Sequence, residues 1–370
     1  MADVFDYLEW RGDILFTQMP PNPVDALIFS ALAYVGYEGI VSETMSDLIT
    51  LKEFADNFLP EDKQINKKLV QQKRQEEMIR VKSDLKLLKA AAESKRFANV
   101  NLCNYRDILL EEQETQFSAI TFLLGNGSAF LAFRGTDYTL TGWKEDFNMT
   151  FQDEIPSQKL AVEYVREFSE NSVANMYLGG HSKGGNLAVY AAAKCETSVQ
   201  ERIQVVYNHD GPGFTENLMG HPGYLAMVPK IRTFVPQSSI VGMLLEHEEP
   251  YSIIKSRQVG GALQHDPYRW EVMGPDFIYL EEVTKDSRFL DRTIKSWMAS
   301  MTNEERDVFV DSLFELLTAG GAELAFDLIR PKNIISYLKT LKSDEEMRKT
   351  IAKELAKLIT VIRKEQDEEV

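Results

Sequence analysis

The sequence is poor in the residues that build disulfide frameworks and metal sites. Its 370 residues include two cysteines, Cys103 and Cys195, and five histidines. Two cysteines exclude a disulfide framework and a zinc site made of cysteine ligands. The shortage of histidine is informative as well, because a catalytic base of the histidine type can only be one of five side chains.

The chain also lacks an excess of positive charge. It has 41 Lys and Arg against 57 Asp and Glu, which gives a formal net charge of −16. A chain this acidic is repelled by a phosphate backbone, so no nucleic-acid partner is expected. The content of 44% hydrophobic residues is ordinary for a globular protein and excludes wholesale disorder.

Long hydrophobic runs are absent too. No stretch of 18 apolar residues occurs, so no membrane-spanning helix is expected. The first fifteen residues carry Asp3, Asp6, Glu9 and Asp13 instead of the basic start and apolar middle of a secretory signal. Together these observations predict a cytoplasmic protein.

The middle of the chain alternates between two patterns. Apolar runs at 119–124 and 129–133 flank Asn126-Gly127, a pair that is typical of hairpin turns. Beyond them, helix-like and strand-like segments follow one another at 141–149, 156–170, 175–178, 185–195, 203–207 and 231–235. This rhythm predicts an α/β fold with a parallel sheet covered by helices.

One short segment carries the strongest functional signal. Gly180-His181-Ser182-Lys183-Gly184 has the Gly-x-Ser-x-Gly pattern of a nucleophile elbow. A serine on a strained turn between a strand and a helix needs small residues two positions before and after it, because larger side chains clash there. A short apolar strand precedes the motif and an alanine-rich helix follows it. Ser182 is therefore the predicted nucleophile.

The elbow and an upstream segment resemble a known family. The run 180–188 is similar to the elbow of lipase-type α/β-hydrolases, and the run 132–137 with Trp143 and Asp146 resembles the oxyanion segment of class 3 lipases. With the acidic N-terminus, they resemble the Mbeg-like bacterial family of α/β-hydrolases related to class 3 lipases, over about residues 115–275. The resemblance implies an α/β-hydrolase fold, with a mostly parallel sheet flanked by helices.

An acyl-transfer site needs hydrogen-bond donors aimed at the developing oxyanion. Lys183, the residue after the serine, offers one backbone N–H. Thr136 follows a strand and a glycine and offers a backbone N–H and a hydroxyl, although it also fits a plain turn residue. The resemblance implies that Arg134 and Asp146 form an ion pair that supports this loop.

Chain order selects the catalytic base. In this fold the nucleophile is followed first by the acid and then by the histidine. His181 precedes the serine and His209 precedes the best acid candidate, so both fail this order. His221 follows that acid closely, and His247 lies in an acidic run that looks exposed. His265 is therefore the predicted base, and its His-x-Pro-x-x-Trp surroundings resemble the element that carries the base in class 3 lipases.

The acid is where the sequence departs from class 3 lipases. Those enzymes place an aspartate in a segment that corresponds to 237–241, where this chain has no carboxylate. Asp210 follows the strand directly after the elbow helix, in a loop that resembles that of pancreatic-type lipases, and a carboxylate there can still reach the imidazole. We predict Asp210 as the acid. The alternative is a turn-forming Asp210, with Asp266 or Glu246 orienting the base.

These motifs predict a serine hydrolase of the lipase or esterase type, which cleaves a carboxylic ester through a Ser-His-Asp triad and an acyl-enzyme. No metal and no organic cofactor are implied. The substrate is expected to be a small acyl ester or a lipid, and Ile240, Val241, Met243 and Leu244 either line the acyl site or belong to the core. The alternatives are a non-catalytic binding or scaffold protein of the same fold, and an acyltransferase or thioesterase.

Two regions lie outside the hydrolase pattern. From Asp62 to Arg96 there are 11 basic and 5 acidic residues, an excess of 6 positive charges. Solvated amphipathic helices are the first interpretation, and a mobile lid or a peripheral contact with anionic lipid is the alternative. The sequence therefore predicts a hydrolase domain at 1–285 with a helical cap or insertion at about 60–100, and a helical extension at 286–370. The oligomeric state stays open.

Overall fold

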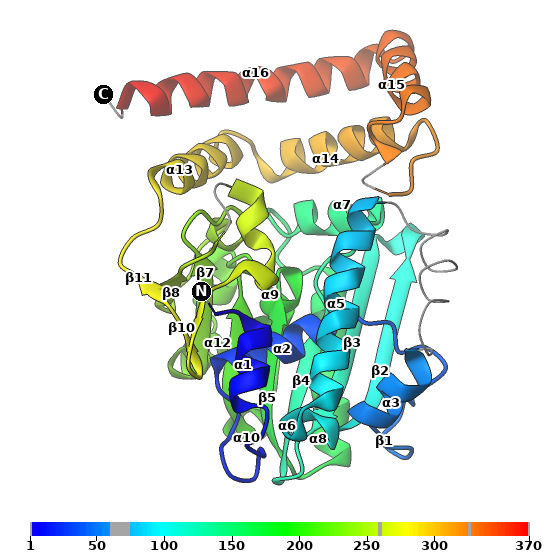
Figure 1. Cartoon of the computed structure of the whole chain (residues 1–370). Coiled ribbons are helices and arrows are strands. Elements are labelled where there is room, and N and C mark those ends of the chain that lie inside the picture. Colours follow the sequence, from blue (N-terminus) through cyan, green and yellow to red (C-terminus); the bar gives the residue numbers. More distant parts are fainter. Residues whose placement is uncertain (1, 60–74, 258–260, 325–326, 369–370) are drawn as a thin grey trace.

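The structure is a computed structural model that describes residues 2–59, 75–257, 261–324 and 327–368. Its centre is a mixed β-sheet flanked by helices (Figure 1). In the described residues, the order of its nine strands is β1 (Ile49–Thr50), β2 (Asn101–Leu110), β3 (Thr115–Leu123), β4 (Ser128–Phe133), β5 (Asn175–His181), β6 (Ile203–His209), β7 (Ile231–Pro236), β8 (Tyr251–Ile254) and β11 (Tyr279–Leu280). A separate pair is formed by β9 (Val272–Met273) and β10 (Asp276–Phe277).

Parallel pairing is confined to the middle of the sheet. Strands β4 to β8 pair in parallel, each with the next. Strands β1 to β4 pair antiparallel, and so do β8 and β11. The expectation of a mostly parallel sheet thus holds for β4 to β8, and the antiparallel pairing of β3 with β4 is the hairpin expected from the sequence. Short turns join β2 to β3 and β3 to β4, and such turns connect only strands of opposite direction. The turn between β3 and β4 is the one predicted at Asn126-Gly127, where Gly127 has a φ of 78°.

Helices cover both faces of the sheet. One face packs against α1 (Val4–Arg11), α2 (Pro23–Leu32), α3 (Leu51–Phe58), α5 (Gln75–Glu93) and α6 (Lys95–Ala98). The other packs against α8 (Pro156–Asn171), α9 (Lys183–Lys194), α10 (Thr197–Arg202), α11 (Glu216–Met219) and α12 (Pro222–Met227). In β4, Phe130 and Ala132 face the first layer, whereas Leu131 and Phe133 face the second. Each strand residue thus contributes to one core or the other, because side chains alternate along a strand.

The basic segment belongs in part to the first layer of helices. Residues 60–74 lie outside the described residues, so the predicted lid is described only in part. Within α5, Leu87, Leu88 and Ala91 are buried in the core. Arg96 is also buried, and its guanidinium lies 2.5 Å from the carboxylate of Asp25. This arginine was expected on a solvated face, and the prediction is wrong because Asp25 on α2 supplies a buried partner for its charge.

The last four helices form a further layer. They are α13 (Lys285–Ala299), α14 (Asn303–Thr318), α15 (Pro331–Ser343) and α16 (Glu345–Glu368). They lie beyond the end of the sheet at which α7 (Leu140–Asn148) is found (Figure 1). Phe309, Val310 and Phe314 of α14 pack against Leu140 and Phe151. Most of the described residues from 285 onwards are therefore helical. In the part of the chain that the structure describes, no helix combines the length and the apolar composition that crossing a bilayer requires.

Candidate active site

Ser182 lies in the turn between β5 and α9. Its φ of 59° and ψ of −137° are unusual for a residue with a side chain, and such a conformation costs about 1–3 kcal/mol. The flanking glycines permit this close turn. A Cβ on Gly180 would lie 2.2 Å from the backbone of Gly184, and one on Gly184 would lie 2.1 Å from the carbonyl of Phe133. The structure therefore contains the strained strand-to-helix turn that the Gly-x-Ser-x-Gly pattern predicts.

Asp210 and His265 are in direct contact. Nδ1 of His265 lies 2.6 Å from Oδ2 of Asp210. The carboxylate is buried, with 1% of the residue exposed, whereas 23% of the imidazole is exposed. An imidazole that donates from Nδ1 to a carboxylate keeps Nε2 free to accept a proton. The two residues that sequence order selected as acid and base are thus brought together by the fold.

The register of β5 and β6 brings Ser182 close to this pair. His181 is opposite His209 across these parallel strands, so Ser182 and Asp210 each follow the last paired residue. The backbone N–H of Ser182 donates to the carbonyl of His209 at 2.9 Å. Among the described residues, no hydrogen bond joins Oγ of Ser182 to His265. Catalytic hydrogen bonds are often long before a substrate is bound, so Ser182 and His265 stay candidates on the strength of their positions.

His181 is a residue of the site that the sequence analysis missed. Its Nε2 donates to the backbone carbonyl of His265 at 2.7 Å, and the two rings lie 4.3 Å apart. Its Nδ1 is 3.2 Å from the hydroxyl of Tyr34. His181 is fully buried, as expected for a residue that holds another in place. It therefore fixes the backbone of His265 beside the elbow, a role that its position before the serine did not reveal.

Ser239 is the second residue that was missed. It lies in the segment where class 3 lipases have their acid, and its Oγ donates to Oδ1 of Asp210 at 2.5 Å. Oγ also accepts the backbone N–H of Gly242 at 3.0 Å. The absence of a carboxylate from 237–241 was correctly noted in the sequence, but the hydroxyl that takes the position carried no signal of its own.

The other candidates for base and orienting acid are engaged elsewhere. His247 contacts Glu249 through Nδ1 at 3.1 Å and the carbonyl of Gly242 through Nε2 at 2.9 Å. Only 6% of its side chain is exposed, so the expectation of an exposed histidine is wrong. His221 accepts the N–H of Gly223 at the start of α12. Of the alternative acids, Asp266 caps the turn Pro267–Arg269 by accepting the N–H of Tyr268, and Glu246 pairs with Lys295.

His209 is buried between the sheet and α2. Its Nδ1 lies 3.2 Å from Oγ of Ser30. Burial lowers the pKa of His209 from 6.5 to about 3, so its imidazole is neutral at ordinary pH. The exclusion of His209 as the base by chain order agrees with this position, which is on the side of the strand facing the N-terminal helices.

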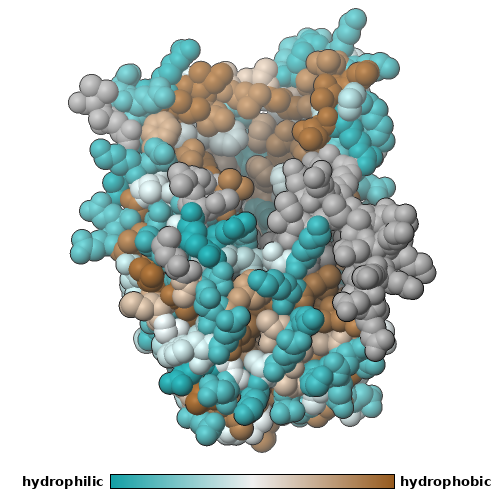
Figure 2. All heavy atoms as spheres, in the orientation of Figure 1, coloured by the Kyte–Doolittle hydropathy of each residue, from teal (hydrophilic) through white to brown (hydrophobic). Residues whose placement is uncertain are grey.

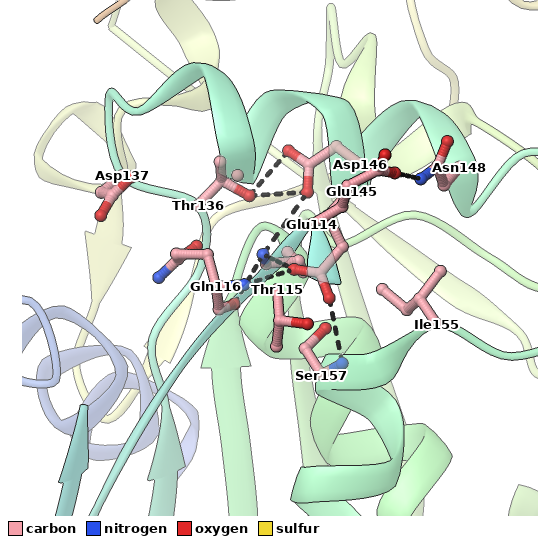
Figure 3. A network of polar contacts seen from close by, with 12 residues as sticks. Glu114, Thr115, Gln116, Thr136, Asp137, Glu145, Asp146, Asn148, Ile155 and Ser157 are labelled. Carbon is pink, nitrogen blue, oxygen red and sulfur yellow. Dashed lines mark hydrogen bonds and ion pairs between the residues drawn. The ribbon is translucent and has the colours of Figure 1, made fainter. Parts of the chain in front are cut away.

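The expected oxyanion residues are held by two consecutive carboxylates of α7. Oγ1 of Thr136 donates to Asp146, at 2.7 Å from each carboxylate oxygen. In Figure 3 the carboxyl group of Asp146 points at Thr136, and that of the preceding Glu145 points the other way. Burial raises the pKa of Asp146 to about 6, although Lys183 and the Thr136 hydroxyl act in the opposite direction. Thr136 is therefore fixed on the loop that follows β4.

Lys183 forms a buried ion pair with Glu145. Its Nζ lies 2.7 Å from Oε2 of Glu145 and donates to the carbonyl of Gln116 at 2.9 Å. The side chains are 1% and 0% exposed. Glu145 also accepts the backbone N–H groups of Gln116 and Ser157, as Figure 3 shows. Lys183, whose backbone N–H is expected to face the oxyanion, is thus anchored by its own side chain.

The expected ion pair between Arg134 and Asp146 is not formed. Arg134 pairs with Asp107 instead, at 2.8 Å, and lies 3.8 Å from Asp137. Asp107 is opposite Ser118 in the register of β2 and β3, and the N–H of Arg134 donates to the carbonyl of Ser118. The three residues form one row across the strands, and the small serine lets the arginine reach the aspartate. Arg134 therefore supports the sheet edge, and Asp146 supports Thr136.

The candidate acyl-site residues and the two cysteines differ in how far they are buried. Of the four candidates for the acyl site, Met243 is buried with Val235 and Val283, whereas Ile240, Val241 and Leu244 are half-buried. Cys103 and Cys195 are buried and free. In the described ranges of the chain, no cluster of three or more His, Cys, Asp and Glu has an arrangement that could hold a metal ion.

Comparisons with known proteins identify one family model and two similar solved structures. A family model described as Mbeg1-like matches residues 91–315. Among solved structures, the chain is similar to a fungal lipase in complex with an inhibitor, which was presented as a model for interfacial activation in lipases. The two sequences are 14% identical, the match covers 46% of this chain and 70% of that chain, and the TM-score is 0.34. It is also similar to the Rhizomucor miehei lipase propeptide complex, with 15% identity, 46% and 59% covered, and a TM-score of 0.32. No curated protein matches the sequence.

Proposed function

We propose that this chain, which belongs to the Mbeg1-like family, is a serine hydrolase of the lipase or esterase type that cleaves a carboxylic ester. The observation that carries the proposal is the 2.6 Å contact between Nδ1 of His265 and Oδ2 of Asp210, on the strand end next to Ser182. A nucleophile on a strained turn, beside a histidine oriented by a buried carboxylate, is the arrangement that acyl transfer through a serine requires.

In the proposed mechanism, Oγ of Ser182 attacks the ester carbonyl while Nε2 of His265 takes the hydroxyl proton. Asp210 holds the imidazole and stabilises the imidazolium that forms. The oxyanion accepts hydrogen bonds from the backbone N–H groups of Lys183 and Thr136. The alkoxide then leaves with the proton from His265, and an acyl-enzyme remains. Water, deprotonated by the same imidazole, attacks this ester and releases the carboxylic acid and Ser182.

We infer an α/β-hydrolase fold for residues 1–285 and a helical extension at 286–370. The support is the position of each group in the parallel part of the sheet. The oxyanion loop follows β4, the nucleophile follows β5 and the acid follows β6, so all three meet at the carboxyl end of neighbouring strands. A small acyl ester or a lipid is the proposed substrate, and half-buried Ile240, Val241 and Leu244 are proposed to lie along its acyl chain.

Labelling with a fluorophosphonate probe tests the proposed nucleophile. We expect a single adduct on the intact chain and none on Ser182→Ala. Ser169→Ala is a matched control, because Ser169 is also half-buried and, among the residues that the structure describes, its hydroxyl bonds only to the carbonyl of Arg166. If the chain does not react, or if Ser182→Ala reacts as the parent does, the protein is a binding or scaffold protein of this fold and the proposed hydrolase is wrong.

The same probe tests the base and the acid. We expect His265→Ala and Asp210→Asn to slow labelling by roughly 10²–10⁴-fold, and His247→Ala to label at close to the parent rate. Loss of labelling in His247→Ala alone would contradict the assignment of the base. Product analysis with added alcohols and with thioesters then separates ester hydrolysis from acyl transfer and from thioester cleavage.

A further inference from the structure

Helix α15 carries an exposed aliphatic surface. Ile334, Ile335 and Leu338 are 45%, 52% and 65% exposed, and Ile329 just before the helix is 78% exposed. The opposite side of the helix faces the protein, since Asn333 is fully buried. These exposures are large for branched aliphatic residues that repeat on one side of a helix. The helix therefore has one packed side and one apolar side that is open to its surroundings.

The same side of the helix is basic. The segment 328–343 contains basic residues and no acidic residue, in a chain whose net charge is −16. Lys332, Lys339 and Lys342 are exposed, and within the described part of the chain they form no ion pair. We call the surface formed by these three lysines with Ile334, Ile335 and Leu338 the α15 face. It combines aliphatic side chains with lysines whose charges have no counterpart in the fold.

The α15 face lies at a corner of the molecule. Figure 1 places α15 at the far end of the last layer of helices, where the chain turns into α16. Figure 2 shows hydrophobic and hydrophilic side chains next to one another over this corner and along α16. On α16, Leu355 and Ile359 are 45% and 51% exposed and lie one turn apart. Apolar surface is therefore present on two neighbouring helices.

Charge decides which partner the α15 face fits. A second copy of the chain, docked through the same face about a two-fold axis, would bring lysines of like charge together. An anionic lipid surface attracts the lysines, while Ile334, Ile335 and Leu338 can enter the boundary between head groups and acyl chains. The flexible stems of lysine allow the ammonium groups to reach the phosphates while the helix lies flat.

We propose that the α15 face docks this protein on an anionic membrane surface. The inference goes beyond the proposed hydrolase and does not depend on the chemistry of Ser182. The sequence suggested the basic segment 62–96 as an alternative site of contact with anionic lipid. The proposal places this contact on the C-terminal helices instead. In that segment Arg96 is paired with Asp25 inside the fold and is not available to lipid.

Co-sedimentation with vesicles tests the docking face. We expect the full chain to bind vesicles of phosphatidylcholine mixed with phosphatidylglycerol, to bind phosphatidylcholine alone much more weakly, and to be released as salt is raised. Lys339→Gln/Lys342→Gln should weaken binding by roughly thirtyfold. Ile335→Ser/Leu338→Ser should weaken it at least about tenfold. The matched control is Leu225→Ser, since Leu225 on α12 is 49% exposed and lies on another surface.

Each variant is first compared with the parent by circular dichroism and by probe labelling of Ser182, which α15 does not touch. The proposal would be overturned if the full chain bound neutral and anionic vesicles equally or bound neither. It would also be overturned if both double variants bound anionic vesicles as tightly as the parent. A dimer in light scattering that the two double variants dissociate would overturn it as well, because the face would then be an interface between copies. If a double variant loses vesicle binding but is still labelled at Ser182, the result supports the docking face and says nothing about the hydrolase. If the parent chain is not labelled, the proposed hydrolase is wrong and the docking face is unaffected.

Discussion

Ser239 donates its hydroxyl hydrogen to Oδ1 of Asp210 at 2.5 Å, while Oδ2 of the same carboxylate is occupied by His265. The serine is itself held, because its carbonyl accepts the hydroxyl of Ser287 on α13 at 2.5 Å. Both oxygens of the acid are thus fixed. The contact also connects the C-terminal helices to the candidate triad through a single intermediate residue.

Removing the Ser239 hydroxyl is expected to slow the reaction without weakening substrate binding. A hydrogen bond to a charged group contributes about 1.5–3 kcal/mol. Without it, Asp210 can rotate away from His265. We expect Ser239→Ala to lower kcat by roughly ten- to a hundredfold, with little change in KM. Steady-state kinetics on a soluble ester measures both constants.

The neighbouring serine provides the control for that prediction. The hydroxyl of Ser238 lies 3.0 Å from the hydroxyl of Thr284 and is not in contact with Asp210. Ser238→Ala is therefore expected to keep kcat within about a factor of two. A comparable fall of kcat in both variants would mean that the strand end as a whole, rather than the Ser239 hydroxyl, positions the acid.

The part of the site that could be predicted from the sequence is the part encoded locally. Ser182 and its two glycines are one continuous pattern, and the requirement for glycine follows from the turn itself. The order of acid and histidine along the chain, together with the resemblance of the segments around Asp210 and His265 to lipase motifs, paired these two residues although 55 residues separate them. Strand order in the parallel sheet made this possible, because consecutive strands bring their carboxyl ends together.

The contacts that were missed depend on register between distant segments. Arg134 meets Asp107 because both lie in one row across β2, β3 and β4. The sequence does not show which row a residue joins, and the resemblance to class 3 lipases implied Asp146 as the partner instead. The pair of Lys183 and Glu145 joins residues 38 apart, and neither carries a motif that points to the other.

Protonation of Asp146 is expected to affect the oxyanion loop near pH 6. Burial raises the pKa of this carboxyl from 3.8 to about 6. Its neutral form is favoured in the fold, so its contribution to stability is present below about pH 4 and is lost as the pH rises through about 6. In the ionised form, which dominates above this range, it accepts the hydrogen bond from Thr136. We expect the acidic limb of the profile of kcat/KM to be shallower in Asp146→Asn, which cannot ionise, measured on a soluble ester over about pH 5 to 8. Superimposable profiles would show that this carboxyl does not control the loop.

His209 is expected to make the fold sensitive to mild acid. Burial lowers its pKa from 6.5 to about 3. Between these values the unfolded chain binds a proton that the folded chain does not, so stability falls as the pH decreases from about 6.5 towards 3. At about pH 5 the loss amounts to about 2 kcal/mol. Urea unfolding of His209→Phe should therefore show about 2 kcal/mol less difference between about pH 7.5 and pH 5 than the parent. The same difference in both proteins would mean that His209 takes up its proton inside the fold.

The buried pair of Lys183 and Glu145 is expected to show strong coupling. Lys183→Met leaves the carboxylate of Glu145 buried without its cation, and breaking a buried pair in this way costs about 3–5 kcal/mol. Lys183→Met/Glu145→Gln removes both charges, so it should recover much of this loss of stability. The recovery should be incomplete, because Glu145 accepts the backbone N–H groups of Gln116 and Ser157 and the new amide can accept only one of them. A double-mutant cycle with Glu145→Gln, followed by urea unfolding, measures the coupling. If the losses of the two single variants simply add in the double variant, the pair contributes no coupling and the elbow is anchored by its backbone alone.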